Sequence, residues 1–106
     1  MKINLQIKPL SVNLAWQGKR FKTPAYKRYE RDVLLMLPKA EITKFDKLKI
    51  TYGFSNKASD IDNPTKMILD ILQKKYGIND RDIEYLVLQK VIVKKGQEFI
   101  EIWFYD

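Results

Sequence analysis

Two helix-start signals divide this chain of 106 residues into segments that must fold differently. Thr23 precedes Pro24, and Asn63 precedes Pro64. In each pair a residue that commonly caps helices stands before a proline that suits the first helical turn. The first signal predicts a helix over residues 24–37. Because a proline cannot lie inside a helix without cost, these positions fix where two helices begin and leave the remaining segments for strands and loops.

Each expected helix carries one apolar face. In the first, apolar residues recur at helical spacing, at Tyr26, Tyr29, Val33 and Leu37. In the second, residues 64–76, the apolar positions are Met67, Ile68, Ile71, Leu72 and Tyr76. Gly77 follows and is expected to end this helix in the left-handed conformation. The two apolar faces predict that both helices pack on a common core.

Four segments have the period-two or β-branched pattern of strands. They lie around residues 3–7, at 47–54, at 83–93 and at 98–105. We expect the last two to form a hairpin through residues 94–97, with Gly96 at positive φ, and Trp103 and Phe104 to lie in the core. Residues 11–22 lack clear periodicity and are expected as an ordered loop. The order βαβαββ predicts one α+β domain over residues 1–106, a mixed sheet packed against two helices.

Cysteine and histidine are both absent from the sequence. Their absence excludes disulfides, cysteine nucleophiles, imidazole metal sites and the Ser-His triad. The N-terminus alternates in polarity, and no apolar run reaches membrane-spanning length, so we expect an intracellular, cytoplasmic protein with no membrane partner. Catalysis, if present, must rely on carboxylates, lysine, tyrosine or a metal ion.

Positive charge dominates the chain. Twenty Lys and Arg residues against 13 Asp and Glu give a net charge of +7. Clustered positive charge favours binding to a polyanion such as nucleic acid, because phosphates release counterions on contact. A basic surface that serves only solubility is the alternative. Charge alone therefore leaves both interpretations open.

Asp60 and Asp62 stand two residues apart just before the second helix. If that approach is extended, both carboxylates point to one face and offer hard oxygen ligands to Mg²⁺ or Mn²⁺. From these residues alone, a capping acid and a solvated loop acid are the simpler explanation. Lys66 lies one helical turn after Asp62, either as its ion-pair partner or as a phosphate contact, and Asn63 is expected as the N-cap. Asp80 follows the helix, roughly 20 Å along its axis from the pair.

Aromatic and basic residues are mixed in the segment before the first helix. Trp16 and Phe21 stand among Lys19, Arg20 and Lys22. Such a mixture can stack on bases and bind phosphates. Equally, the aromatic side chains can anchor the segment to the core.

Several motifs together resemble the RusA family of Holliday-junction resolvases. They are the run Pro9-Leu10-Ser11-Val12-Asn13, residues 26–33, Asp60-x-Asp62-Asn63-x-x-Lys66, Asp70, and residues 77–83. The resemblance covers nearly the whole chain. It implies a homodimeric, metal-dependent endodeoxyribonuclease of bacterial or phage origin that nicks four-way junctions symmetrically during recombination and repair.

The resemblance also implies roles for individual residues. Asp60, Asp62 and Asp80 match the family's metal-binding catalytic acids, with Asp82 as a second choice for the third acid, and Lys66 matches its catalytic lysine. The expected metal is Mg²⁺, with Mn²⁺ possible. The residues expected to contact DNA are Asn13, Trp16, Lys19, Arg20, Lys22, Lys27 and Lys57. Two alternatives remain: a non-catalytic junction-binding protein of the same fold, and a metal-dependent ribonuclease.

Overall fold

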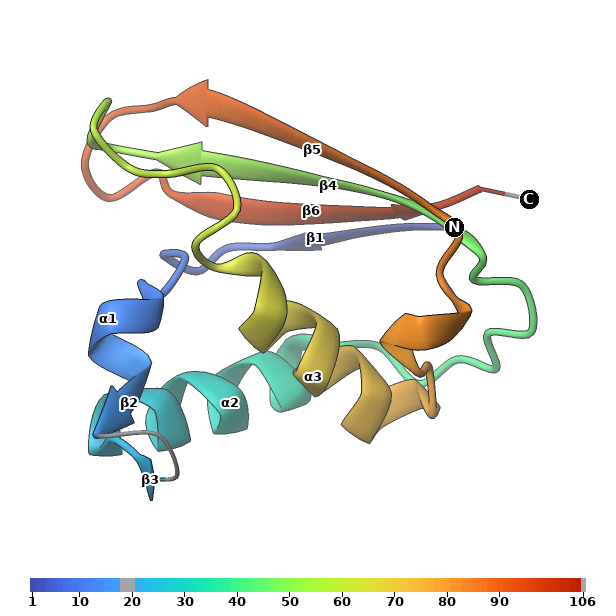
Figure 1. Ribbon diagram of the computed structural model, residues 1–106. Helices are drawn as coiled ribbons and strands as arrows, with labels where there is room; N and C mark the ends of the chain where they lie inside the picture. The colour runs from blue at the N-terminus through green and yellow to red at the C-terminus, as the bar shows by residue number, and fades with distance from the viewer. Residues whose placement is uncertain (18–20, 106) are drawn as a thin grey trace.

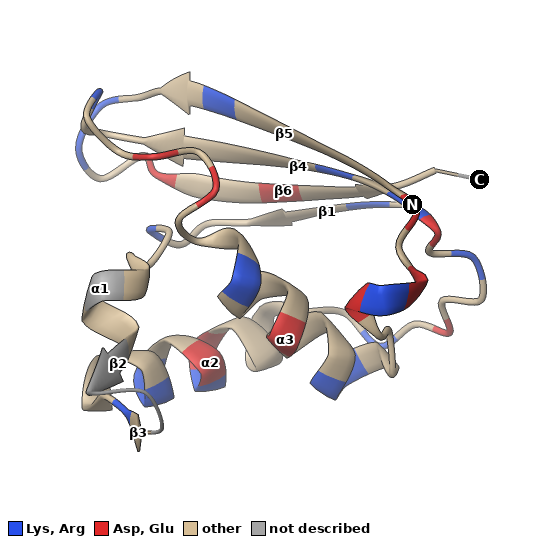
Figure 2. Ribbon diagram, viewed as in Figure 1, with Lys and Arg blue, Asp and Glu red and all other residues tan. Residues whose placement is uncertain are grey.

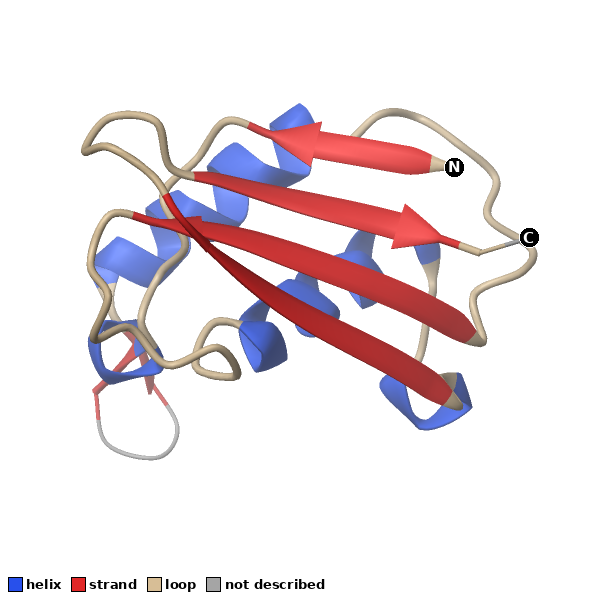
Figure 3. Cartoon of the chain, turned by 90° about the horizontal axis from the view of Figure 1, so that it is seen from above, coloured by secondary structure: helices blue, strands red, loops and turns tan. Residues whose placement is uncertain are grey.

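A four-stranded sheet forms one layer of the fold and two helices form the other (Figure 1). The computed structural model describes residues 1–17 and 21–105. Its elements in chain order are β1 (Lys2–Leu5), α1 (Val12–Ala15), β2 (Trp16–Gln17), β3 (Phe21–Lys22), α2 (Pro24–Met36), β4 (Lys47–Phe54), α3 (Thr65–Tyr76), the 3-10 turn η1 (Asp80–Asp82), β5 (Tyr85–Ile92) and β6 (Phe99–Phe104). Both long helices lie on one face of the sheet (Figure 3).

The α+β architecture with the order βαβαββ is confirmed for the long elements. Residues 11–22, expected as a loop, contain the one-turn helix α1 and the short antiparallel pair of β2 and β3. That expectation was incomplete, because a single helical turn and two-residue strands are too short to produce a periodic pattern.

The sheet order is β1-β6-β4-β5, and this order contradicts the expected hairpin. β4 pairs with β5 in parallel and with β6 antiparallel. The last two strands are therefore separated by β4, and the connection between them crosses it. Gly96 does adopt a positive φ, of 92°, as expected, but it shapes a crossover loop and not a hairpin turn.

The first helix begins as the sequence predicts, and the second does not. The Thr23 side chain caps α2 by accepting a hydrogen bond from the backbone N–H of Tyr26, at 3.2 Å. In α3 the N-cap position belongs to Pro64, which has no side-chain group for capping, so the expectation that Asn63 is the N-cap was wrong. Gly77 ends this helix with φ 73°, as predicted.

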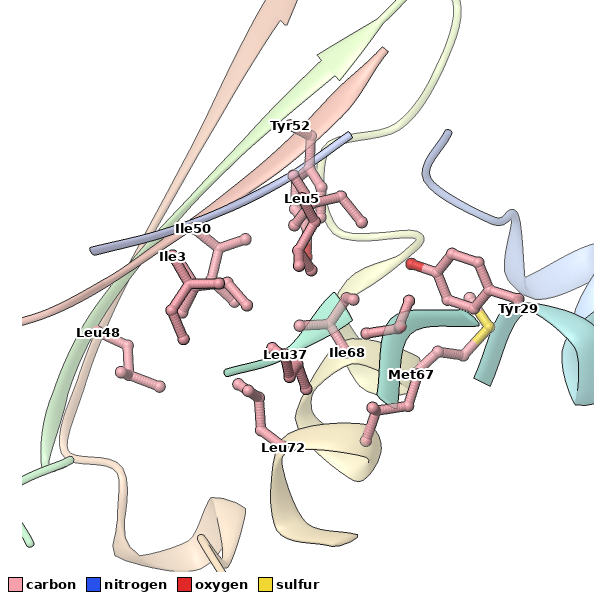
Figure 4. Close-up of a cluster of buried hydrophobic side chains, with 14 of the residues drawn as sticks. Ile3, Leu5, Tyr29, Leu37, Leu48, Ile50, Tyr52, Met67, Ile68 and Leu72 are labelled. Carbon is pink, nitrogen blue, oxygen red and sulfur yellow. The ribbon is translucent and has the colours of Figure 1, made fainter. Parts of the chain in front are cut away.

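The core lies between the sheet and the two helices (Figure 4). The helix-facing residues of the sheet are buried with the apolar faces of α2 and α3, including Ile3, Leu5, Tyr26, Tyr29, Val33, Leu48, Ile50, Tyr52, Met67, Ile68, Ile71 and Leu72. Phe104 is buried as expected, but Trp103 is 41% exposed. Neighbouring residues on a strand face opposite sides, so only one of the two could reach the core.

In the part of the chain that the structure describes, the other face of the sheet carries no helix (Figure 3). Within residues 1–17 and 21–105, no helix has both the length and the apolar character needed to cross a membrane.

Candidate functional site

Asp60 and Asp62 lie on the loop between β4 and α3, where Figure 2 shows acidic residues. Both side chains are exposed. Two successive turns shape the backbone: the N–H of Asn63 donates to the carbonyl oxygen of Asp60 at 3.4 Å, and that of Thr65 donates to the carbonyl oxygen of Asp62 at 3.1 Å. The approach to the helix is thus turned and not extended. The alternation of a strand therefore does not set the directions of the two carboxylates.

The donor chemistry of Asp60 and Asp62 suits a hard divalent cation. Across the described residues, neither side chain takes part in a hydrogen bond or an ion pair. Two free, solvent-facing carboxylates are the kind of ligands that Mg²⁺ accepts while it keeps several waters. Within residues 1–17 and 21–105, however, no three acidic side chains lie close enough together to hold a metal ion. The single chain therefore supplies two candidate ligands here and does not gather Asp80 with them.

Lys66, on the first turn of α3, connects the helix start to the turn that follows the helix. Its Nζ lies 3.1 Å from Oδ1 of Asp70 and 3.2 Å from Oδ2 of Asp80. The alternative pairing of Lys66 with Asp62 does not occur. Asp82 pairs with the adjacent arginine at 3.9 Å. Of the two turn acids, Asp80 is therefore the one that contacts Lys66, the lysine of the Asp-x-Asp-Asn-x-x-Lys segment.

The two carboxylates also affect the charge of Lys66. Its hydrogen bond to Asp70, and next that to Asp80, hold the pKa of the ammonium above its ordinary value. Lys66 is consequently a cation throughout the neutral range. Its chemistry there is that of a fixed positive charge and a hydrogen-bond donor, not of a general base.

Asn63 ties the N-terminal part of the chain to the acidic loop. Its Oδ1 accepts a hydrogen bond from the backbone N–H of Val12 at 3.0 Å. This N–H belongs to the first turn of α1 and has no partner within the helix, so a side-chain acceptor satisfies it. The amide therefore stabilises the contact between α1 and the loop. Its position before a proline had predicted a helix cap instead.

A buried hydroxyl pair fixes the start of α3 against the sheet. The hydroxyls of Tyr52, on β4, and Thr65 lie 2.8 Å apart, and both residues are buried. Burial raises the pKa of the Tyr52 phenol, although the contact with Thr65 opposes the shift, so the phenol stays protonated. A paired hydroxyl avoids the cost of a buried polar group without a partner. The helix start is therefore anchored directly behind the acidic loop.

Lys90 also contacts the acidic loop, and the sequence analysis did not identify this residue. Its Nζ donates to the carbonyl oxygens of Lys57 and Ser59, at 2.9 and 2.8 Å. Lys90 is on the edge strand β5, and its register partner on β4 is Tyr52. The available signal was a lysine next to Gln89 in a strand that is otherwise apolar. It indicated a polar partner close to the strand, but not which loop would supply it.

The expected DNA contacts divide into three groups. Lys27 and Lys57 are exposed, and their ammonium groups have no partner among the described residues. Lys22 instead pairs with Glu30 at 2.9 Å and lies 5.1 Å from the ring centre of Tyr26. Outside the described residues and side chains lie Asn13, Trp16, Lys19 and Arg20.

Glu30 lies between two lysines and joins α2 to its neighbours. Its carboxylate oxygens accept hydrogen bonds from Lys22 and from Lys74 of α3, each at 2.9 Å. Burial raises the pKa of Glu30, but the two ammonium groups outweigh burial and hold the pKa below its ordinary value of 4.5. The bridge links β3, α2 and α3 below the sheet, so Lys22 has a structural role here.

Replacing Glu30 with glutamine is expected to lower the free energy of unfolding at neutral pH by roughly 1 kcal/mol, a typical net contribution of one hydrogen bond. Because the folded-state pKa is depressed, the bridge stabilises the fold above pH 4.5 and this stabilisation is lost as the pH falls through the folded-state value. Urea unfolding at neutral pH and at about pH 3 measures the difference. Glu41→Gln, the same change at an exposed loop position, is the control. An equal loss at both pH values would contradict the role of charge.

Comparison with known families gives one match. The model of the RusA endodeoxyribonuclease family matches residues 11–103, a span that contains the acidic loop, Lys66 and Asp80. Among curated proteins, no individual sequence matches the chain.

Proposed function

The chain belongs to the RusA family of Holliday-junction endodeoxyribonucleases, and we propose that Asp60, Asp62 and Asp80 form its metal-binding catalytic centre. Its substrate class is junction DNA, and its reaction is hydrolysis of phosphodiester bonds. The observation that best supports the residue assignment is the double contact of Lys66. Among the lysines that the structure describes, the one in the Asp-x-Asp-Asn-x-x-Lys segment, Lys66, is the one that contacts Asp80, at 3.2 Å.

The proposed roles follow from the chemistry of each side chain. Asp60 and Asp62 present uncommitted carboxylates to solvent and would hold the ion, which in family members is generally required. A bound Mg²⁺, or Mn²⁺, would supply Lewis acidity and an activated water. Lys66, a permanent cation at neutral pH, would offset negative charge on the phosphate or on the leaving 3′ oxygen.

A second copy of the chain is the partner that we propose. Paired nicks in opposing strands require two catalytic centres, and one chain carries one Asp-x-Asp-Asn-x-x-Lys segment. The resemblance implies a homodimer whose acids gather near its centre. We propose that pairing, together with DNA, brings Asp80 toward Asp60 and Asp62, and that Asp80 then exchanges its contact with Lys66 for the ion.

Exposed lysines on the helix layer and the acidic loop would contact the DNA backbone. Lys27 and Lys57 are suited to this role because their ammonium groups are not engaged elsewhere in the described part of the chain. Phosphate contacts of this kind weaken steeply with salt. Junction affinity is therefore expected to fall as ionic strength rises.

A synthetic mobile four-way junction tests the proposed function. With Mg²⁺ or Mn²⁺ present, paired symmetric nicks are expected in opposing strands, and none with chelator. A linear duplex of the same sequence and a single-stranded RNA serve as control substrates. Salt-dependent binding of the junction without cleavage in any divalent ion would instead identify a junction-binding protein, and cleavage confined to RNA would identify a ribonuclease.

A further inference from the structure

A cavity of about 630 Å³ opens beside Asp60. It lies between the segment that links β1 to α1 and the loop that links β4 to α3, two parts of the chain that meet near α1 in Figure 1. Small-molecule sites typically measure about 300–1,000 Å³, so the cavity is large enough for one nucleotide unit. Asp60 and Asn63 both line it, which places the cavity at the edge of the proposed catalytic centre.

Part of the cavity wall is apolar. Leu10 and Leu14 contribute from the N-terminal segment, Phe54 from the end of β4 and Pro64 from the start of α3. Leu14 is 61% exposed, an unusual degree for a leucine beside a cavity. A planar, weakly hydrated group such as a nucleobase matches apolar walls of this kind, because its faces gain by leaving water.

Hydrogen-bond donors remain available in the same cavity. The amide oxygen of Asn56 accepts from the N–H of Ala58 at 2.9 Å, and that of Asn63 accepts from the N–H of Val12 at 3.0 Å. Because both oxygens are engaged with backbone donors, the amino group of each asparagine is left to donate. Within the described residues those amino groups have no hydrogen-bond partner, whereas the ammonium of Lys8 lies close enough to Glu98 to help lower the pKa of that carboxyl.

The charge of the lining argues against a phosphate inside the cavity. Asp60 and Glu98 contribute two carboxylates, and Lys8 contributes one ammonium group. Hydrogen bonds from its own backbone N–H and from the Ser55 hydroxyl hold the pKa of Glu98 low, so this carboxylate is charged. A neutral ring with donors and acceptors on its edge fits this set, since asparagine and carboxylate groups both pair with base edges.

We propose that this cavity receives a single unstacked nucleobase. The base belongs to the nucleotide next to the phosphate that is cleaved at Asp60 and Asp62. The inference rests on the proposed function, because it takes the acidic loop as the place of cleavage. Removing a base from its stack is costly in a duplex and costs least where pairing is already disturbed, as at a branch point. Occupancy of the cavity would therefore favour cleavage at the branch point over cleavage within an arm.

A junction that carries 2-aminopurine at a branch-point position tests the proposal, since the fluorescence of this base rises when it unstacks. The protein is the Asp62→Asn chain in chelator, which is expected to bind the junction without cutting it. A several-fold rise is expected for the branch-point probe, and no rise for a probe placed well inside an arm. Ala58→Phe, added to fill the cavity, should abolish the rise, whereas Ala40→Phe, the same change at an exposed position, should preserve it.

The outcomes separate the two claims. Circular dichroism and junction affinity establish that each variant is folded and bound before fluorescence is compared. If the Ala58→Phe and Ala40→Phe proteins bind with equal affinity and give the same rise, the cavity does not receive the base and the inference fails, while metal-dependent cleavage by the unsubstituted chain leaves the proposed function intact. If the unsubstituted chain neither binds nor cleaves the junction, the proposed function fails and takes this inference with it.

Discussion

Asp62→Asn is expected to abolish cleavage of a four-way junction and to leave the junction bound. The substitution keeps the size of the side chain and removes one of the two uncommitted carboxylates of the acidic loop. If that carboxylate holds the ion, several kcal/mol of transition-state stabilisation disappear, which corresponds to a loss of about 100-fold or more in rate. Affinity should stay equal or increase, because a negative charge near the phosphates is removed.

Single-turnover cleavage and gel-shift binding of the same junction measure the two effects separately. Asp32→Asn is the matched control, because Asp32 is also an acid but lies on α2 and pairs with its neighbour Arg31 at 3.1 Å. Its cleavage rate should remain close to that of the unsubstituted chain. Undiminished cleavage by Asp62→Asn would remove this residue from the catalytic centre, and a large loss of binding would assign it a structural role.

Ile50→Ala is expected to cause the largest loss of stability among single substitutions considered for this chain. Ile50 is fully buried on β4, the strand that pairs with both β5 and β6 and leads into the acidic loop. Removing its outer carbons leaves a cavity in the core, at a cost of about 2–5 kcal/mol. For a domain of this size each kcal/mol lowers Tm by roughly 4–8 °C, so a fall of about 10 °C or more is expected.

Thermal and urea unfolding measure the loss. Val91→Ala supplies the comparison, because Val91 is a β-branched strand residue on the edge strand and is 37% exposed. Its effect should be much smaller, since part of its surface already contacts water. Equal losses for the two variants would show that the core is not centred on β4.

Local patterns were sufficient for the long elements but not for their pairing. The helix of residues 24–36 was predictable because its cap, its proline and its apolar spacing all act within the helix itself. The order of the strands was not predictable, because β4 lies between β5 and β6 and the residue pattern of a strand does not specify its neighbours. Nearness in sequence favoured a hairpin of the last two strands. In the fold, β4 lies between them and pairs with both.

The candidate site shows the same division between residue identity and residue contact. The spacing of Asp60, Asp62 and Lys66 marked the segment in advance, because those positions follow one another in the chain. The contact of Lys66 with Asp80 depends on the path of the chain after α3. The hydrogen bond from Lys90 to the loop depends on where β5 lies in the sheet. Asn63 likewise accepts a hydrogen bond from the backbone of a residue 51 positions away, instead of capping the helix that follows it.

The position of β6 has a consequence for how the protein is made. β6 comes after the other strands of the described sheet in sequence, yet it lies between β1 and β4 and pairs with both. While β6 is still inside the ribosome, the strand that joins β1 to β4 is missing. The sheet is then divided, and part of the core is exposed to water. Contacts between such distant segments also slow folding. Nuclease activity should therefore appear only after synthesis of β6 is complete, and not while the chain is emerging.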